Sequence, residues 1–363
     1  MDFSLMMETE KKPRKLKLGE APYTYARIAA MRSKLIKKDE YNRLMKMKLN
    51  DILRFLQETE YRKEIDEMAV SYSGIELVEL ALNKNLVKTF LKLKRIAEYG
   101  DLRLVMAEYM NRRDVWNIKT ILRGKSINEK EDKIRDLLIP IGELDQKFFD
   151  ELLKKESVED VIRSLKLLTK EQAKEAVEFF SERKSLFVIE NTLDNLYYSK
   201  SIEFSRQMPK QGAFFRNFIE NEIDVLNIRT ILKLKKEGMQ KKDIEKFIFY
   251  SGARLKKHDL LRLARAEDID SMMGMLNKMG YEKILKDVYD KSKKDITKVE
   301  LRLNRYLLDR VILLLHQHPL SIDVILGYMF AKEIEIRNLR TLIKGRQLGL
   351  KDEFIENELV VGG

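Results

Sequence analysis

Apolar residues recur at helical spacing along almost the whole chain. Ile52, Phe55 and Leu56 stand at i, i+3 and i+4, and the segment from Leu80 to Leu91 keeps the same period. Strand-like alternation between turn residues is scarce, and only 5 prolines and 15 glycines interrupt 363 residues. Because a period of about 3.6 residues places apolar side chains on one face of a helix, we predict an all-α protein.

One ten-residue helical segment occurs three times, at residues 114–123, 224–233 and 335–344. Every copy carries an acid, then Asn three residues later and Thr six residues later. The polar positions are Asp114, Asn117 and Thr120 in the first copy, Asp224, Asn227 and Thr230 in the second, and Glu335, Asn338 and Thr341 in the third. The Asn residues are 110 and 111 residues apart, a longer period than that of common solenoids, so we expect each copy to be a small domain.

A second marker keeps the same frame. Glu79, Glu190 and Glu300 each precede the matching Asn by 37 or 38 residues, inside a Glu-x-x-Leu-Asn/Asp pattern. Two markers in one frame indicate three tandem modules that build a larger pseudo-symmetric body. We place helical modules at residues 23–133, 134–243 and 244–363, after an N-terminal tail at residues 1–22.

The repeated Asn and Thr lie in the middle of a predicted helix, where both residue types lower helix stability. Their return in every copy predicts hydrogen bonds to a partner helix, for which Glu79, Glu190 and Glu300 are the candidate partners. We favour a structural network inside each module, since one asymmetric active site would not need its residues in triplicate; a ligand site is the alternative. Positions that differ between copies, such as Trp116, Leu226 and Arg337, are better places to look for function.

The charge balance favours an acidic partner. The chain has 71 Lys and Arg against 59 Asp and Glu, a formal charge of +12, so nucleic acid, anionic lipid headgroups or an acidic protein would be attracted. The chain has no cysteine, which excludes disulfides, thiolate metal sites and cysteine nucleophiles and suits an intracellular protein. We find neither a signal peptide nor an apolar stretch of the roughly 20 residues that a membrane helix needs.

Motifs of catalysis are missing from the sequence. Gly124-Lys125-Ser126 resembles the end of a phosphate-binding loop, but Lys119 stands where the motif needs glycine, so we interpret Gly124 as a helix C-cap. His316 and His318 precede Pro319 without further ligands, which favours a surface turn over a metal site. We therefore predict that the chain is not an enzyme and uses no cofactor or metal.

Two alternatives of other classes stay open. Basic clusters at residues 11–15, 235–242 and 291–294 could contact phosphates, so a basic helical scaffold that binds nucleic acid is one alternative. These clusters lack an aromatic stacking platform, and a solvated surface is the simpler interpretation. The other alternative, an unrecognised enzyme, would need a deep pocket with perturbed titratable groups.

The combination of features resembles a known family. The opening segment 23–36, the three modules with their repeated Asp/Glu-Val/Ile-x-Asn helix and the lack of cysteine are similar to the C subunit of archaeal A-type and bacterial V-type ATPases, the relative of the d subunit of eukaryotic V-ATPases. The resemblance runs from Tyr23 to the C-terminus. It implies three similar helical domains around a pseudo-threefold axis, forming a funnel.

The resemblance also implies a mechanical role. Such a subunit is a non-catalytic rotor adapter: it seats on the cytoplasmic face of the membrane proteolipid ring, receives the central stalk, binds no nucleotide and transmits torque for ion transport coupled to ATP synthesis or hydrolysis. It is a single-copy, peripheral membrane protein of a hetero-oligomeric complex, and we expect no nucleic acid. Our candidate partner interface consists of Arg27, Arg32, Arg112, Arg113, Trp116, Arg229, Arg337 and Arg340. A competing expectation is that Lys119, Arg229 and Arg340 only close intramodule hydrogen bonds.

Overall fold

The computed structural model describes residue 16 and residues 22–97, 101–209, 213–285, 288, 296–317 and 322–361. Regular structure within these ranges is entirely helical, which confirms the predicted all-α class. Most of the predicted N-terminal tail, the basic stretch 11–15, the lysine run 291–294 and His318 lie outside the described residues. His316 belongs to a helix backbone that continues to Gln317, so the surface turn predicted for this residue was wrong.

The chain forms two compact units, each with its own core, and the predicted three-module division stays a prediction. The first unit is built mainly from Leu53–Pro209 and the second from Glu20–Ile52 with Lys210–Gly363. Helix α3 (Leu49–Gln57) spans the boundary. The first unit also contains α4 (Arg62–Met68), α5 (Gly74–Ile96), α6 (Leu102–Met110), α7 (Arg112–Ser126), α8 (Glu131–Asp136), α9 (Gln146–Leu153), α10 (Val158–Ser164), α11 (Lys170–Arg183) and α12 (Phe187–Arg206).

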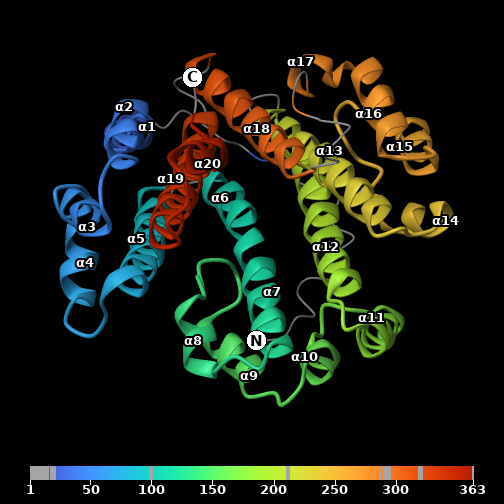
Figure 1. Ribbon diagram of the computed structural model, residues 1–363, viewed down its shortest axis with the longest axis horizontal. Coiled ribbons are helices and arrows are strands. Elements are labelled where there is room, and N and C mark those ends of the chain that lie inside the picture. Colours follow the sequence, from blue (N-terminus) through green and yellow to red (C-terminus); the bar gives the residue numbers. More distant parts are fainter. Residues whose placement is uncertain are drawn as a thin grey trace. The chain divides into compact units, whose positions relative to one another are not determined.

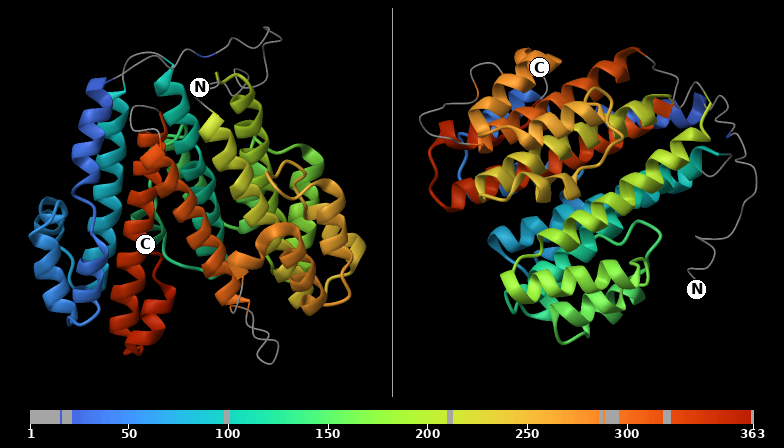
Figure 2. Two further views of the ribbon diagram at one scale, coloured as in Figure 1. Left: turned by 90° about the horizontal axis from the view of Figure 1, so that it is seen from above. Right: turned by 90° about the vertical axis from the view of Figure 1, so that its right-hand side faces the viewer.

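The second unit combines helices from the early and the late parts of the chain. It contains α1 (Pro22–Arg32), α2 (Lys38–Leu44), α13 (Ala213–Lys236), α14 (Lys241–Ile244), the 3₁₀ turn η3 (Glu245–Phe247), α15 (Lys257–Arg265), α16 (Ile269–Leu276), the π-turn η4 (Asn277–Tyr281), α17 (Glu282–Leu285), α18 (Thr297–Gln317), α19 (Ile322–Gln347) and α20 (Asp352–Glu358). Helices α18 and α19 lie side by side, and α1 packs against α19 (Figure 1). Figure 2 shows the same long helices from two further sides.

Several helices begin where the sequence supplies a cap. Ser157 accepts a hydrogen bond from the amide of Asp160 at the start of α10. Thr169 and Gln172 exchange side-chain to main-chain hydrogen bonds at the start of α11, the arrangement known as a capping box. These local bonds pair main-chain N–H groups that the first turn of a helix leaves free, so the helix starts are set by sequence.

The helix that carries the repeated segment ends in the same way in all three copies. Asn128, Gly238 and Gly349 follow it with positive φ, at 56°, 74° and 63°. The next residue in each copy donates its amide to a carbonyl five residues back, as from Glu129 to Gly124, in the pattern of a left-handed helix cap. The interpretation of Gly124 as the C-cap was therefore wrong. Gly124 lies inside the last turn, where a Cβ would come within 2.5 Å of Ile134 Cδ1.

Candidate functional site: the repeated polar network

Each repeated Asn binds the main chain of a segment 22 residues further along. Asn117 Nδ2 donates to the carbonyl of Ile139 and its Oδ1 accepts the amide of Ile139, both at 2.9 Å. Asn227 bonds in the same way to Phe249, and Asn338 to Val360. The three Asn side chains are almost fully buried. We expected the Glu of a neighbouring helix as their partner, and this was wrong. The side-chain amide of each Asn instead donates to the C=O and accepts from the N–H of one residue, the two bonds that a neighbouring β-strand would make.

The acid of the first two copies holds the loop that follows. Asp114 Oδ2 accepts the amides of Glu143 at 2.8 Å and Leu144 at 3.1 Å. Asp224 accepts the amides of Arg254 at 2.7 Å and Leu255 at 3.2 Å. The acid and the Asn, one helical turn apart, thus fasten an irregular segment onto the repeated helix at two points.

A glycine makes room for each of these carboxylates. A Cβ on Gly142 would stand 2.2 Å from Asp114 Oδ1, and one on Gly252 would stand 1.8 Å from Asp224 Oδ1. No real Cβ approaches an oxygen so closely. Gly142 and Gly252 stand 110 residues apart, so they belong to the same repeated arrangement as the two aspartates.

Burial acts on the charge of both carboxyl groups. Loss of water around Asp114 raises its pKa to about 7, although the amides of Leu144 and Glu143 act in the opposite direction. Burial likewise raises the pKa of Asp224 to about 6, against the amides of Arg254 and Leu255. The amide bonds favour the ionised form, whereas burial favours the protonated form, and burial is the stronger effect.

The third copy takes its loop from the early part of the chain. Glu335 Oε2 accepts the amide of Ile36 at 2.6 Å, across 299 residues of sequence. Ile36 stands two residues before α2, as Leu144 stands before α9 and Leu255 before α15. The segment around Ile36 therefore takes the place that residues 143–144 and 254–255 take in the other copies.

An ion pair accompanies this difference. Lys332 Nζ donates to Glu335 Oε1 at 2.9 Å and is 0% exposed. The equivalent positions in the first and second copies hold Asn111 and Asn221. Burying a lysine is costly unless it is paired, so Lys332 and Glu335 depend on one another.

The repeated Thr is locally bonded in the first copy. Thr120 Oγ1 donates to the carbonyl of Trp116 in its own helix at 2.9 Å, rather than to a partner helix as we expected. Thr230 is buried and Thr341 is half-buried. Mid-helix threonines commonly satisfy their hydroxyl in this way, one turn back along the helix.

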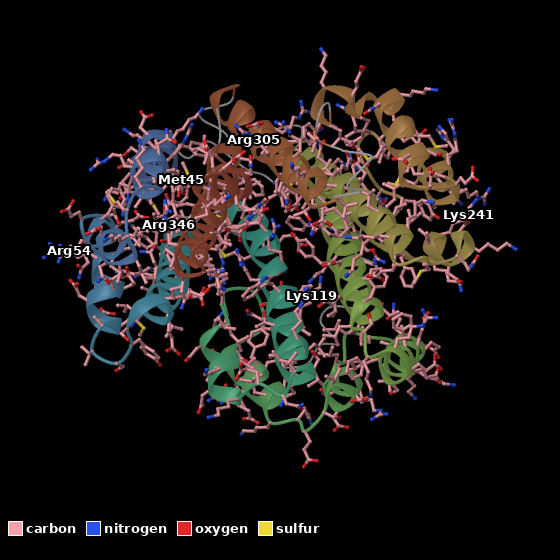
Figure 3. All side chains as sticks on the ribbon, viewed as in Figure 1. Met45, Arg54, Lys119, Lys241, Arg305 and Arg346 are labelled. Atoms are coloured by element: carbon pink, nitrogen blue, oxygen red, sulfur yellow. The ribbon has the colours of Figure 1, made fainter. Side chains whose placement is uncertain are left out.

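Two of the repeated Glu positions form ion pairs with the repeated helix of the preceding copy. Arg123 Nη2 donates to Glu190 Oε2 at 2.8 Å, and Lys119 pairs with Asp194, so two bridges join α7 to α12. Figure 3 shows Lys119 on the side of α7 that faces α12. In the second unit, Arg229 lies 3.9 Å from Glu300 and links α13 to α18.

These ion pairs bear on the competing expectation for Lys119 and Arg229. By the predicted boundaries, Lys119 and Asp194 belong to successive modules, as do Arg229 and Glu300. On those predicted boundaries the pairs do not lie within one module, whereas the competing expectation for Lys119 and Arg229 was intramodule hydrogen bonds alone. The pairs join one repeat to the next because the Glu-bearing helices of the second and third repeats, α12 and α18, pack against the repeated helices α7 and α13.

Comparison with known proteins identifies the family. The sequence profile described as ATP synthase (C/AC39) subunit matches residues 24–358. The chain belongs to this family. The C subunit of the A-type ATP synthase of Methanosarcina acetivorans is 38% identical over 97% of this chain and 96% of its own length. The corresponding protein of Archaeoglobus fulgidus is 32% identical over 93% and 96%, and that of Haloferax volcanii is 30% identical over 93% and 97%.

Membership in the ATP synthase (C/AC39) family confirms the resemblance seen in the sequence. This chain is a non-catalytic ATP synthase subunit. Within the described ranges no cluster of His, Asp and Glu side chains could hold a metal ion. No helix in the same ranges is long and apolar enough to cross a membrane.

Several candidate interface residues of this family member lie beside aromatic rings. The guanidinium of Arg113 stands 5.8 Å from the Trp116 ring, and that of Arg112 stands 5.0 Å from Tyr109. Arg27 stacks over Tyr23 on α1. Arg32 and Arg340 are half-buried on α1 and α19.

The second unit places two cations of the candidate interface near one another. Arg337 on α19 is half-buried, and Arg229 on α13 is exposed. Burial, and then the charge of Arg229, lower the pKa of Arg337. Trp116 and Leu226, which occupy the equivalent position in the other copies, are half-buried as well. One position of the repeated helix thus carries an aromatic ring in the first copy, an aliphatic side chain in the second and a cation in the third.

Proposed function

We propose that this chain is the rotor adapter of an A-type ATP synthase, seated between the central stalk and the proteolipid ring at the cytoplasmic face of the membrane. The observation that carries the proposal is the match over nearly the whole chain to relatives named as the C subunit of A-type ATP synthases. An adapter of this kind would be a peripheral membrane protein, present once in each complex, and would transmit torque without binding nucleotide.

The repeated network suits a part that must transmit force. Asn117, Asn227 and Asn338 each fasten an irregular segment to a long helix through buried hydrogen bonds. Buried and fully paired polar groups resist rearrangement, because every alternative leaves a donor or acceptor unpaired. Ion pairs such as Arg123 with Glu190 tie successive repeats together. We propose that this bonding supplies the stiffness that torque transfer requires.

Differences between equivalent positions suit an asymmetric stalk. Trp116, Leu226 and Arg337 occupy one position of the repeated helix, and Arg337 lies near the cation of Arg229. We propose that this position, together with the other candidate interface arginines, faces the stalk. Acidic side chains of a partner would relieve the repulsion between the two guanidinium groups.

Co-purification from native membranes tests the adapter role. The tagged full chain is extracted in mild detergent and the accompanying proteins are identified by mass spectrometry. We expect proteolipid and central-stalk subunits together with ATPase activity. Recovery of nucleic acid in their place would reject the adapter and support the basic-scaffold alternative.

A pair of matched variants tests the stalk-facing residues. Trp116→Ala combined with Arg337→Ala should reduce the amount of stalk subunit recovered with the chain. Arg163→Ala combined with Arg262→Ala removes two arginines outside the repeated helices and serves as the control. Equal recovery with both double variants would contradict a stalk-facing role.

A further inference from the structure

The region between α13 and α15 concentrates positive charge. Residues 233–257, from the end of α13 to the start of α15, expose eight Lys and Arg side chains and one acid, Glu237. The eight cations form the basic surface: Lys233, Lys236, Lys241, Lys242, Lys246, Arg254, Lys256 and Lys257. Helices α13, α14 and α15 pack against one another, so these side chains lie on neighbouring elements. Figure 3 shows Lys241 at the edge of the second unit.

Part of the charge on the basic surface is balanced within the chain. Asp243 pairs with Lys246 at 2.8 Å, and Glu245 pairs with an arginine of α15 at 2.6 Å. The half-buried Asp259 accepts the amide of Lys256. The next exposed acids lie beyond the end of α15, at residues 267 and 268. Three lysines around the turn from α13 to α14 pair with no acid in the described part of the chain: Lys236, Lys241 and Lys242. Neighbouring cations without an internal carboxylate attract an anionic partner.

The other two copies do not carry this charge at the same place. Residues 233–257 contain nine Lys and Arg and three Asp and Glu. The matching residues of the first copy, 123–147, contain six of each sign, and residues 344–363 of the third copy contain three cations and four acids. All three segments follow the same repeated helix and begin with the same left-handed cap. The fold therefore does not require the excess of lysine in the second copy, which points to a contact outside the chain.

The types of residue on the basic surface fit lipid headgroups better than a protein. Seven of its eight cations are lysines. Lysine is depleted in protein interfaces, where arginine is favoured. Clusters of about four to eight lysines and arginines instead bind anionic headgroups, which need charge rather than a fixed geometry. Tyr250 is 42% exposed, with the Lys257 ammonium 5.4 Å from its ring centre. Such amphipathic rings are typical of the headgroup region of a membrane.

We propose that the basic surface docks on the anionic lipid headgroups of a bilayer, with Lys236, Lys241 and Lys242 at its centre. This inference rests on the proposed function, because that function seats the chain at the cytoplasmic face of the membrane. The attraction acts over about one Debye length, so it holds the surface against headgroups without fixing it to one lipid. The second copy differs from the others because it carries this contact.

Vesicle co-sedimentation of the purified full chain tests the basic surface. The probes are vesicles of phosphatidylglycerol and phosphatidylcholine in equal parts, and vesicles of phosphatidylcholine alone. We expect wild type to sediment with the anionic vesicles only, and added salt to release it. Lys236→Gln, Lys241→Gln and Lys242→Gln combined should weaken binding to the anionic vesicles about a hundredfold, since each lysine near such a surface strengthens binding roughly fivefold.

A matched triple variant controls for net charge. Lys130→Gln combined with Lys133→Gln and Lys147→Gln removes the same charge from exposed positions of the first copy. We expect this control to bind anionic vesicles as wild type does. Because all six lysines are exposed, both triple variants should keep the thermal stability of wild type. Equal vesicle binding by the two triple variants would overturn the proposal, as would a wild-type chain that does not bind anionic vesicles.

Co-purification in detergent separates a lipid contact from a protein contact and from failure of the adapter role. We expect the variant without Lys236, Lys241 and Lys242 to recover the same ATP synthase subunits as wild type. If this variant loses a subunit but still binds anionic vesicles as wild type does, the occupant is an acidic protein and the lipid proposal fails. If the wild-type chain recovers no ATP synthase subunits, the proposed function fails, whatever the vesicle result.

Discussion

At the scale of single residues, the repeated polar side chains act as bridges between helix and loop. Asn117, Asn227 and Asn338 each satisfy one main-chain donor and one main-chain acceptor in a segment without regular structure. Buried main-chain groups must be paired, and an irregular segment leaves more of its groups without main-chain partners than a helix does. A single amide side chain therefore allows an irregular segment to lie in the interior.

Removing this side-chain amide should destabilise the fold. We expect Asn227→Ala to lower the free energy of unfolding by about 2–4 kcal/mol, because it leaves the amide and carbonyl of Phe249 buried without a partner. Urea unfolding monitored by circular dichroism measures the change. Asn357→Ala, at an exposed position of α20, should stay within about 0.5 kcal/mol of wild type. Equal effects of the two substitutions would contradict the bridging role.

Two glycines provide a matched comparison of available space. Gly252→Ala should destabilise by about 1–3 kcal/mol, since its methyl group would meet the Asp224 carboxylate. Gly274→Ala, within α16 and facing open space, should instead stabilise by up to about 1 kcal/mol because alanine favours helix. Thermal unfolding of both variants gives the sign of each effect. A neutral Gly252→Ala variant would show that the loop moves away from Asp224 at no cost.

At the scale of elements, Asp114 links the attachment of a loop to the protonation of its own carboxyl group. Asp114 sits near the start of α7 and holds the amides of Glu143 and Leu144 ahead of α9. Its pKa is raised to about 7 in the folded chain, against an ordinary value of 3.8. Between these two values the folded protein binds more protons than the unfolded one.

Stability should therefore fall as pH rises through this window. The contribution of Asp114 is fully present below about pH 4 and is lost as pH rises towards 7, because the folded state must then ionise a buried carboxyl group. In the Asp114→Asn variant this dependence should be missing. Urea unfolding at several values between pH 4 and 8 gives the difference between wild type and variant, and a difference that does not vary with pH would contradict the prediction.

At the scale of the whole molecule, three copies of one sequence signature are bonded in two ways. In the first two copies Asp114 and Asp224 bind main-chain amides of a loop that follows the repeated helix. The third uses Lys332 with Glu335 and binds Ile36, in the early part of the chain. The second compact unit thus joins residues 20–52 to the last part of the chain.

Exchanging the pairs tests whether the two arrangements are equivalent. Lys332→Asn alone should destabilise by about 3–5 kcal/mol, because Glu335 stays buried without its cation. Adding Glu335→Asp installs the residue types that the second copy has at these positions, Asn221 and Asp224, and we expect the double variant to be more stable than the single one. The free energies of chemical unfolding of wild type, Lys332→Asn, Glu335→Asp and the double variant complete a double-mutant cycle. An additive cycle would show that the two side chains act independently.

The sequence by itself determined the helical class and the threefold repetition. A helical period and an approximately 110-residue spacing are local or linear signals, and neither depends on how the chain packs. The Asn, Asp and Glu positions could be selected for the same reason, because polar residues that return in one frame stand out without a structure. The charge of the basic surface could have been found by comparing the copies position by position, although nothing in the sequence shows that its side chains are exposed.

Only the tertiary structure decided what these residues touch. Asn117 could have paired with a helix or a loop, and the choice of Ile139 depends on which main-chain groups lack partners after packing. Arg123 meets Glu190 of the next repeat because of how α7 packs against α12. Glu335 meets Ile36 across 299 residues. Hydrogen bonds and ion pairs require proximity in space, and a linear pattern carries no record of that proximity.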